Sequence, residues 1–145
     1  MNFIAKNFGE LSVTELYEIL RVRSQIFILE QNMHCQDIDG SDFEARHFFL
    51  EEKGKILAYL RAFYTDDSKL VVKIGRVLSI THGVGLGADI MKRAIADIKK
   101  NMECQKLCLN SQKSAIGFYE KLGFKTVSDE FLEEGVIHLK MQLEI

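Results

Sequence analysis

The stretch THGVGLGADIMKRAIADIKK, residues 81–100, places three glycines at alternating positions directly before a segment with helical spacing. Gly83, Gly85 and Gly87 have no Cβ atom, so the backbone around them can approach a ligand closely. The N–H groups at the positive end of the following helix would suit an anion such as a pyrophosphate. A tight strand-to-helix turn explains the same glycines without a ligand, and the residues alone leave both interpretations open.

Two common nucleotide-binding motifs do not fit this turn. Gly83, Gly85 and Ala88 match the dinucleotide pattern GxGxx(G/A), whose ribose-binding acid follows about 20 residues later at the end of the next strand. Glu103 lies at that distance but precedes the expected strand 106–111, and too little chain remains for the six-stranded dinucleotide fold. A Walker loop is excluded because the chain has no GK(S/T).

Composition indicates one globular domain over residues 1–145. With 145 residues, 47% of them hydrophobic and 28% charged, the chain can bury about 70% of the surface that its unfolded form exposes. The net charge of -2 indicates no polyanion-binding surface, so no nucleic acid is expected as a partner. No apolar run approaches the ~20 residues of a membrane span, and the N-terminus has no signal-peptide core. We therefore expect a cytoplasmic protein with no membrane partner.

The three cysteines give no sign of a metal site. Cys35, Cys104 and Cys108 are an odd number without CxxC spacing, and a reducing compartment would keep them as thiols. No four-ligand zinc spacing is present, so no metal is expected. Cys108 has the apolar neighbours of a strand and is interpreted as a core thiol rather than a nucleophile.

The chain alternates strands and helices in the order β-α-β-β-β-α-β-α-β, which predicts a mixed α/β sheet. Strands are expected at residues 3–8, 47–52, 55–64, 69–80, 106–111 and 136–143, with a further strand near 125–127. Helices are expected at residues 13–31, after the glycine turn, and at 114–123.

The first helix has a clear start signal. Ser12 and Glu15 have the spacing of a capping box. Arg23 interrupts the apolar stripe of this helix and is expected at its edge. The polar stretch over residues 31–46 then predicts a loop that can line a site.

Two motifs resemble those of a known family. IGRVLSITHGVGLGADIM, residues 74–91, resembles the acetyl-CoA signature of the GNAT N-acetyltransferases, a strand followed by (Q/R)xxGx(G/A) and a helix. Gly85 and Gly87 occupy the glycine positions, and His82 stands where the family usually has Gln or Arg. LNSQKSAIGFYEKLGF, residues 109–124, resembles the distal motif of the same family.

The rest of the chain is similar to ElaA-like members of that family. Residues 16–42 resemble their N-terminal LRxxxF(x)xEQ core and QDxDxxD loop, and EEGVIHLKM, residues 133–141, resembles their C-terminal ending. The resemblance implies a GNAT acetyltransferase fold, in which a mixed, mostly antiparallel central sheet has flanking helices and a splayed strand pair. In that fold, the pantetheine chain inserts between the splayed strands.

The resemblance also implies acetyl-CoA as the co-substrate and assigns residues to it. They are Leu78, Ser79 and Ile80 on the strand, His82, Gly83, Val84, Gly85, Leu86, Gly87 and Ala88 in the turn, and Asn110 and Phe118 in the distal motif. A main-chain N–H around Leu78 to Ile80 is expected to donate to the carbonyl oxygen on which negative charge develops.

Catalysis by direct amine attack needs an acid near the sulfur and a base for the amine. The family position of Tyr119 makes it the expected acid, while a ring packed in the core is the alternative. Deprotonating a lysine-like amine of pKa ~10.4 at pH 7 costs ~4.6 kcal/mol, so a base or water chain is expected. Glu30 and His47 are the expected bases and His138 a third candidate, although each also fits a structural role.

The expected function is N-acetylation of a primary amine on a small molecule or peptide. Asp37, Asp39 and Asp42 either cap turns, the interpretation we favour, or attract a cationic acceptor. The alternative is a catalytically weak acyl-CoA-binding or regulatory module of the same fold, which His82 motivates. The sequence leaves open the acceptor, the acyl-chain preference and the oligomeric state, including a homodimer.

Overall fold

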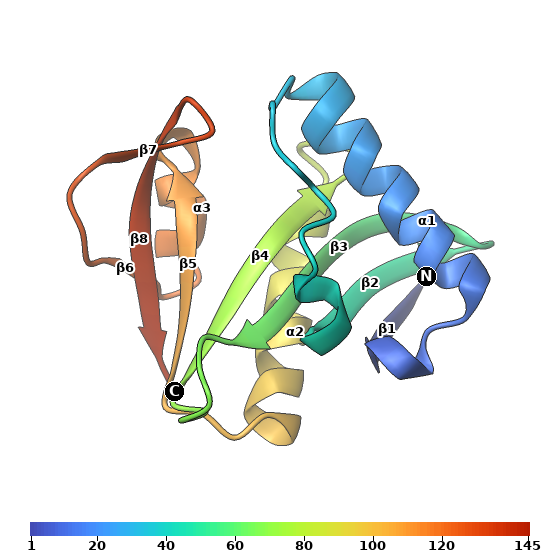
Figure 1. Ribbon diagram of the computed structural model, residues 1–145, viewed down its shortest axis with the longest axis horizontal. Coiled ribbons are helices and arrows are strands. Elements are labelled where there is room, and N and C mark those ends of the chain that lie inside the picture. The colour runs from blue at the N-terminus through green and yellow to red at the C-terminus, as the bar shows by residue number, and fades with distance from the viewer.

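The computed structural model describes residues 1–145, which form one open eight-stranded sheet with helices on both faces (Figure 1). The strand order is β1-β2-β3-β4-β5-β8-β6, and β7 also pairs with β8. Neighbouring strands are antiparallel except β4 and β5, which confirms the predicted mixed, mostly antiparallel sheet. The strands are β1 (Asn2–Asn7), β2 (Arg46–Glu52), β3 (Lys55–Tyr64), β4 (Val71–Ser79), β5 (Lys106–Gln112), β6 (Lys125–Thr126), β7 (Phe131–Glu133) and β8 (Val136–Glu144).

Three α-helices flank the sheet, with α1 on one face and α2 and α3 on the other (Figure 1). They are α1 (Val13–Arg23), α2 (Leu86–Asn101) and α3 (Ile116–Glu120). Short 3₁₀ turns are η1 (Phe8–Glu10), η3 (Ser41–Glu44) and η4 (Lys113–Ala115), and η2 (Ser24–Glu30) is a π-helical turn. No helix of the structure is both long and apolar enough to cross a membrane.

The start of α1 is the predicted capping box. Ser12 Oγ accepts from the Glu15 amide at 3.0 Å, and Glu15 Oε1 accepts from the Ser12 amide at 2.8 Å. The α-helix ends at Arg23 and continues as the π-helical turn, instead of running as one α-helix to residue 31. Arg23 is fully buried rather than at the edge of the stripe, because carboxylates described below neutralise it.

Each face of the sheet has its own hydrophobic core. The apolar stripe predicted for α2 packs against strands β2 to β5 and comprises Ile90, Met91, Ala94, Ile95 and Ile98. On the other face, α1 and η2 supply Ile19, Val22 and Ile26, which pack against Phe49, Tyr59 and Leu78. The two cores fix the sheet rigidly between helices.

Strands β4 and β5 separate soon after they meet. Only residues Val71–Lys73 of β4 pair in parallel with residues Lys106–Cys108 of β5. Beyond these residues the two strands diverge (Figure 1). The splayed strand pair expected from the family resemblance is therefore present. Beyond Lys73, the edges of β4 and β5 that face each other have no strand partner.

A β-bulge in β4 lies beside this opening. Tyr59 faces Leu78 and Arg61 faces Gly75, so Arg76 and Val77 together lie opposite a single residue of β3. Arg76 adopts a φ of 53°, the left-handed region that non-glycine residues seldom occupy. The bulge re-aims the backbone at the point where the strands part.

The C-terminal strands form a wall of the opening. The short strand expected near residues 125–127 is β6, and β7 is a further strand that the sequence did not predict. Glu134 and Gly135, with φ values of 52° and 75°, connect β7 to β8 in a two-residue hairpin.

Candidate active site

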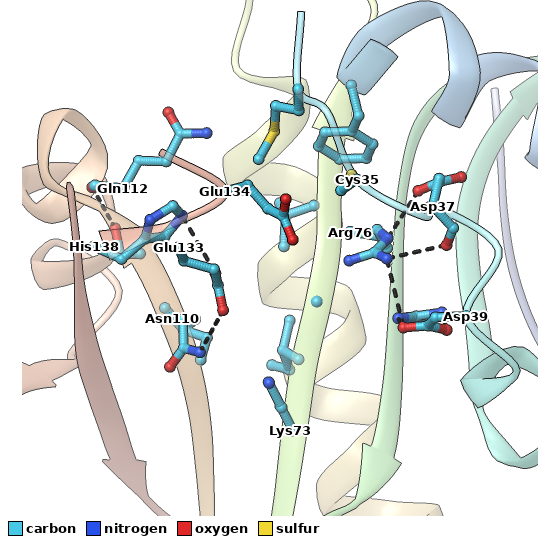
Figure 2. A pocket seen from close by; sticks show the side chains of 18 of the residues that line it. Cys35, Asp37, Asp39, Lys73, Arg76, Asn110, Gln112, Glu133, Glu134 and His138 are labelled. Atoms are coloured by element: carbon cyan, nitrogen blue, oxygen red, sulfur yellow. Dashed lines mark hydrogen bonds and ion pairs between the residues drawn. The ribbon is translucent and has the colours of Figure 1, made fainter. Parts of the chain in front are cut away.

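A cleft of about 730 Å³ lies where β4 and β5 diverge. One wall carries side chains of the loop before η3 and of β4, and the opposite wall carries side chains of β5, β7 and β8 (Figure 2). The labelled residues are Cys35, Asp37, Asp39, Lys73 and Arg76 on the first wall and Asn110, Gln112, Glu133, Glu134 and His138 on the second. Tyr119 of α3 also lines the cleft.

Tyr119 has both of the features that the sequence left as alternatives. Its ring packs edge-on against Phe118 and Phe124, with centroid distances of 5.0 and 6.0 Å, and belongs to the core. Its hydroxyl forms no hydrogen bond with any protein group, although the residue lines the cleft. Burial raises the pKa of Tyr119 to about 12, so the phenol stays protonated at neutral pH. A neutral donor without a protein partner is therefore available to the cleft.

The glycine turn has the backbone conformation that the sequence indicated. Gly83 and Gly85 have φ values of 79° and 80°, and Gly85 precedes the first residue of α2. No side chain caps that helix start, so its first N–H groups are open to an anion. A Cβ at Gly87 would lie 3.4 Å from Phe118 Cζ, which brings the turn next to α3 and Tyr119.

The segment of β4 expected to supply the oxyanion donor lies just beyond the bulge. The Ile80 amide donates to the Leu57 carbonyl at 3.0 Å and is not free to bind a second acceptor. Leu78, Ser79 and Ile80 do not line the cleft, whereas Gly75, Arg76 and Val77 do. Residues 78–80 therefore do not face the cleft, and their contact with an acyl carbonyl stays a prediction.

His47 does not lie in the cleft, and the prediction that it acts as a base is corrected. It is fully buried, with Nδ1 2.7 Å from Tyr59 Oη and Nε2 3.0 Å from the Asp42 carbonyl oxygen. Burial lowers the pKa of His47, and both ring nitrogens already have partners. His47 is a structural residue between the sheet and η3.

The other two candidate bases occupy different places. Glu30 is exposed at the end of η2, forms no ion pair and does not line the cleft. The structure therefore does not bring Glu30 together with Tyr119. His138 does line the cleft, with Nδ1 2.8 Å from the Val136 carbonyl oxygen and Nε2 3.4 Å from Glu133 Oε2.

The loop before η3 is fastened by pairs between aspartates and arginines that the sequence did not reveal. Asp37 binds Arg23 and Arg76 at 3.1 and 2.8 Å. Asp42 binds Arg23 and Arg61 at 2.7 and 2.9 Å. Asp39 accepts from the Ser41 amide, as a turn residue would, and also binds Arg61 at 2.9 Å.

This network changes what the three aspartates can do. Although burial alone would raise it, hydrogen bonds from Arg61 hold the pKa of Asp39 well below its ordinary value. The charges are thus balanced by arginines of the same chain, and they hold one wall of the cleft on β3 and β4. The arginines lie on separate helices and strands, so no sequence spacing links them to the aspartates. The one available signal was Arg23, a charge within the apolar stripe of its helix.

The structure contains no group of three or more His, Cys, Asp or Glu side chains arranged to hold a metal ion. Burial raises the pKa values of Cys35 and Cys108, so neither thiol has the lowered pKa of a nucleophile. Asn110 Nδ2 donates to Glu133 Oε1 at 3.2 Å and thereby orders the acidic wall.

Comparisons with known proteins agree with this architecture. Residues 23–145 match the family model described as an acetyltransferase (GNAT) domain. The chain is 34% identical to a UPF0039 protein of Schizosaccharomyces pombe over 100% of this chain and 98% of that protein. It is 32% identical to protein ElaA of Escherichia coli over 94% of this chain and 92% of ElaA.

Solved structures show the same relationship. The crystal structure of Escherichia coli ElaA superposes with a TM-score of 0.90 at 30% identity, covering 97% of each chain. An acyl-CoA N-acyltransferase from Pseudomonas aeruginosa superposes with a TM-score of 0.88 at 31% identity, again covering 97% of each chain. With its splayed strands, its glycine turn and these relatives, the chain belongs to the GNAT acyltransferase family and to its ElaA-like branch.

Proposed function

We propose that the chain is an acetyl-CoA-dependent N-acetyltransferase that moves an acetyl group to a primary amine of a small molecule or peptide. The observation that supports it best is the opening between β4 and β5 with the unpartnered hydroxyl of Tyr119 beside it. An extended chain such as pantetheine can add to exposed strand edges through main-chain hydrogen bonds. The thioester at the end of the pantetheine chain would then lie next to a neutral acid, the hydroxyl of Tyr119.

The two ends of the donor would be held by backbone groups. The uncapped start of α2 after Gly85 suits the pyrophosphate, because several N–H groups and the helix dipole favour negative charge there. The bulge at Arg76 and Val77 lines the cleft and supplies main-chain groups where the acyl carbonyl would lie.

The reaction is proposed to be a direct transfer. A neutral amine attacks the thioester carbon, the C–N bond forms, and the C–S bond breaks. Tyr119 donates its hydroxyl proton toward the departing sulfur, which leaves as the free thiol of coenzyme A. The attacking nitrogen loses one proton as the amide forms, and this proton restores the Tyr119 hydroxyl. The proton that an ammonium gives up before attack is therefore the one set free for each acetyl group transferred.

A cationic acceptor is the preferred class. The aspartates of the first wall are balanced by arginines, so attraction must come from the second wall. There, Glu133 and Glu134 line the cleft, and Glu134 forms no ion pair. These carboxylates would favour the approach of an ammonium group.

Release of free thiol from acetyl-CoA in the presence of a panel of primary amines tests the proposal. Amine-dependent release with mass-spectrometric detection of the N-acetyl product is the expected result. Parallel assays with longer acyl-CoA thioesters test whether acetyl is preferred. Tight acetyl-CoA binding without amine-dependent release would instead favour the acyl-CoA-binding or regulatory module that exposed His82 motivates.

A further inference from the structure

His138 has one ring nitrogen whose protonation state the backbone dictates. Nδ1 lies 2.8 Å from the Val136 carbonyl oxygen, and a carbonyl oxygen can only accept a hydrogen bond. Nδ1 must therefore carry a proton. In the neutral ring, the lone pair then resides on Nε2.

Nε2 faces a second acceptor rather than a donor. Glu133 Oε2 lies 3.4 Å away, and Glu133 Oε1 is held at 3.2 Å by Asn110 Nδ2. A lone pair opposite an ionised carboxylate is unfavourable unless a proton lies between them. The pair is thus arranged to stabilise a proton that arrives on Nε2.

The surroundings fix this geometry and leave the pair accessible. The His138 ring stacks on Phe131 with a centroid distance of 6.1 Å and is only 3% exposed, which restricts its orientation. The Glu133 side chain is 42% exposed, so it connects the buried ring to solvent. Both residues line the cleft that contains Tyr119.

We infer that His138 is the general base that removes the proton from the acceptor amine, and that Glu133 is the positioning residue that holds the resulting imidazolium. This inference rests on the proposed function and names the group that the sequence assigned to Glu30 or His47. Those two residues lack the required setting, because neither of them lines the cleft.

An ammonium acceptor gives one N–H proton to Nε2, so that N–H bond breaks and the Nε2–H bond forms. The neutral amine attacks the thioester, while the imidazolium is stabilised by Glu133. The ring then returns its proton to solvent along the exposed carboxylate, which restores the lone pair for the next amine.

The charged groups around the ring are few. Glu133 belongs to β7, and Glu134 to the hairpin turn. Lys113 of η4 is neutralised by Glu130 at 2.8 Å, and Lys140 lies two residues further along β8. Glu133 and Glu134 are thus the acidic side chains beside the ring.

The test compares two acceptors of nearly the same shape. Phenethylamine is almost wholly protonated at pH 7.5, as an alkylamine of pKa ~10 must be, whereas O-benzylhydroxylamine is uncharged there and needs no base before attack. His138→Asn keeps a side-chain N–H at the position of Nδ1 and removes Nε2. We expect it to lower kcat/KM for phenethylamine by ~10²-fold, within the range of acid–base groups, and for O-benzylhydroxylamine by less than ~3-fold.

Two more variants separate chemistry from structure. Glu133→Gln should lower kcat/KM for phenethylamine by ~10-fold and spare O-benzylhydroxylamine. Glu144→Gln, the same change on the neighbouring strand β8 and outside the cleft, should leave both unchanged. Thermal melting and acetyl-CoA affinity should stay at wild-type values in all three. Equal losses with both acceptors, or no loss with phenethylamine, would overturn the role of His138 while leaving the proposed function intact.

A direct measurement on the ring completes the test. In ¹⁵N-histidine NMR of the wild-type chain, the neutral form of His138 should carry its proton on Nδ1, and Glu133→Gln should shift the Nε2 resonance. A neutral ring protonated on Nε2 would reject the inference whether or not any amine is acetylated. Failure of the wild-type chain to release thiol with every amine would reject the proposed function and, with it, the base.

Discussion

Replacement of Tyr119 by Phe isolates the hydroxyl that we place beside the departing sulfur. The ring that packs against Phe118 and Phe124 is kept. Because the hydroxyl forms no hydrogen bond within the protein, its removal leaves no buried partner unsatisfied. Tyr119→Phe should therefore melt close to the wild-type temperature, and a change in rate can be assigned to the chemistry.

The size of the effect follows from the pKa of the phenol. Burial raises the pKa of Tyr119 to about 12, which is about 3.5 pH units above the ~8.5 pKa of an ordinary thiol. Complete proton transfer to a free thiolate would thus be uphill by about 5 kcal/mol, so the proton moves only as the C–S bond breaks. A hydrogen bond to the developing charge contributes ~1.5–3 kcal/mol, which corresponds to a ~10- to 150-fold decrease in kcat.

The assay is thiol release under single-turnover conditions, where chemistry rather than product release limits the rate. Acetyl-CoA affinity, measured by calorimetry, should stay within ~2-fold of wild type. Since Tyr119 keeps its proton up to a pH near 12, kcat should not fall between pH 8 and 11 through ionisation of this residue. Tyr17→Phe, on the exposed face of α1, is the matched control. A wild-type single-turnover rate in Tyr119→Phe would refute the role of Tyr119.

Three further changes test other parts of the site. Gly85→Val places a β-branched residue at a φ of 80°, where its Cβ would meet no atom within 4 Å, so calorimetry should show acetyl-CoA binding weakened at least ~10-fold in a folded protein. Unchanged affinity would remove the turn from the donor site. Asp42→Ala leaves buried Arg23 and Arg61 short of a partner and should lower the free energy of unfolding by ~3–5 kcal/mol in denaturant titrations. Burial alone would raise the pKa of Asp42, but Arg23 holds that pKa below its ordinary ~3.9. The stability that the Asp42 carboxylate contributes is therefore present above pH ~4 and is lost as the pH falls further. An Asp42→Ala variant as stable as wild type at pH 7 would contradict the network. Glu30→Gln should change neither kcat/KM nor its pH profile, and a selective loss at low pH would restore Glu30 as the base.

Features set by local chemistry could be predicted from the sequence. The capping box at Ser12 and the apolar stripe of α2 each depend on residues three or four positions apart. The positive φ at Gly85 follows from a residue without a Cβ directly before a helix. The splayed strands came from the family resemblance instead, because no local signal indicates where two distant strands stop pairing.

Features that depend on distant partners could not be predicted in this way. The β7–β8 hairpin was missed for a different reason: its two turn residues, Glu134 and Gly135, are not the Asn-Gly or Asp-Gly pair that marks such turns. Arg23 is buried because Asp37 and Asp42 reach it from a loop 14 and 19 residues away. A charge in an apolar stripe is costly unless it is paired, so such an interruption predicts a partner without naming it.

The two strand histidines show how far strand alternation could have distinguished a core residue from a site residue. His138 shares its face of β8 with Lys140, and the residues of β5 that pair with these two, Gln112 and Asn110, are also polar. Such a face is not covered by a hydrophobic helix and is open to solvent or ligand. His47 instead shares its face of β2 with Phe49, which α1 covers, and both of its ring nitrogens have protein partners there. The sequence placed His47 ahead of His138 as a candidate base, whereas the face of the sheet on which each histidine lies favours His138 in the role that we propose.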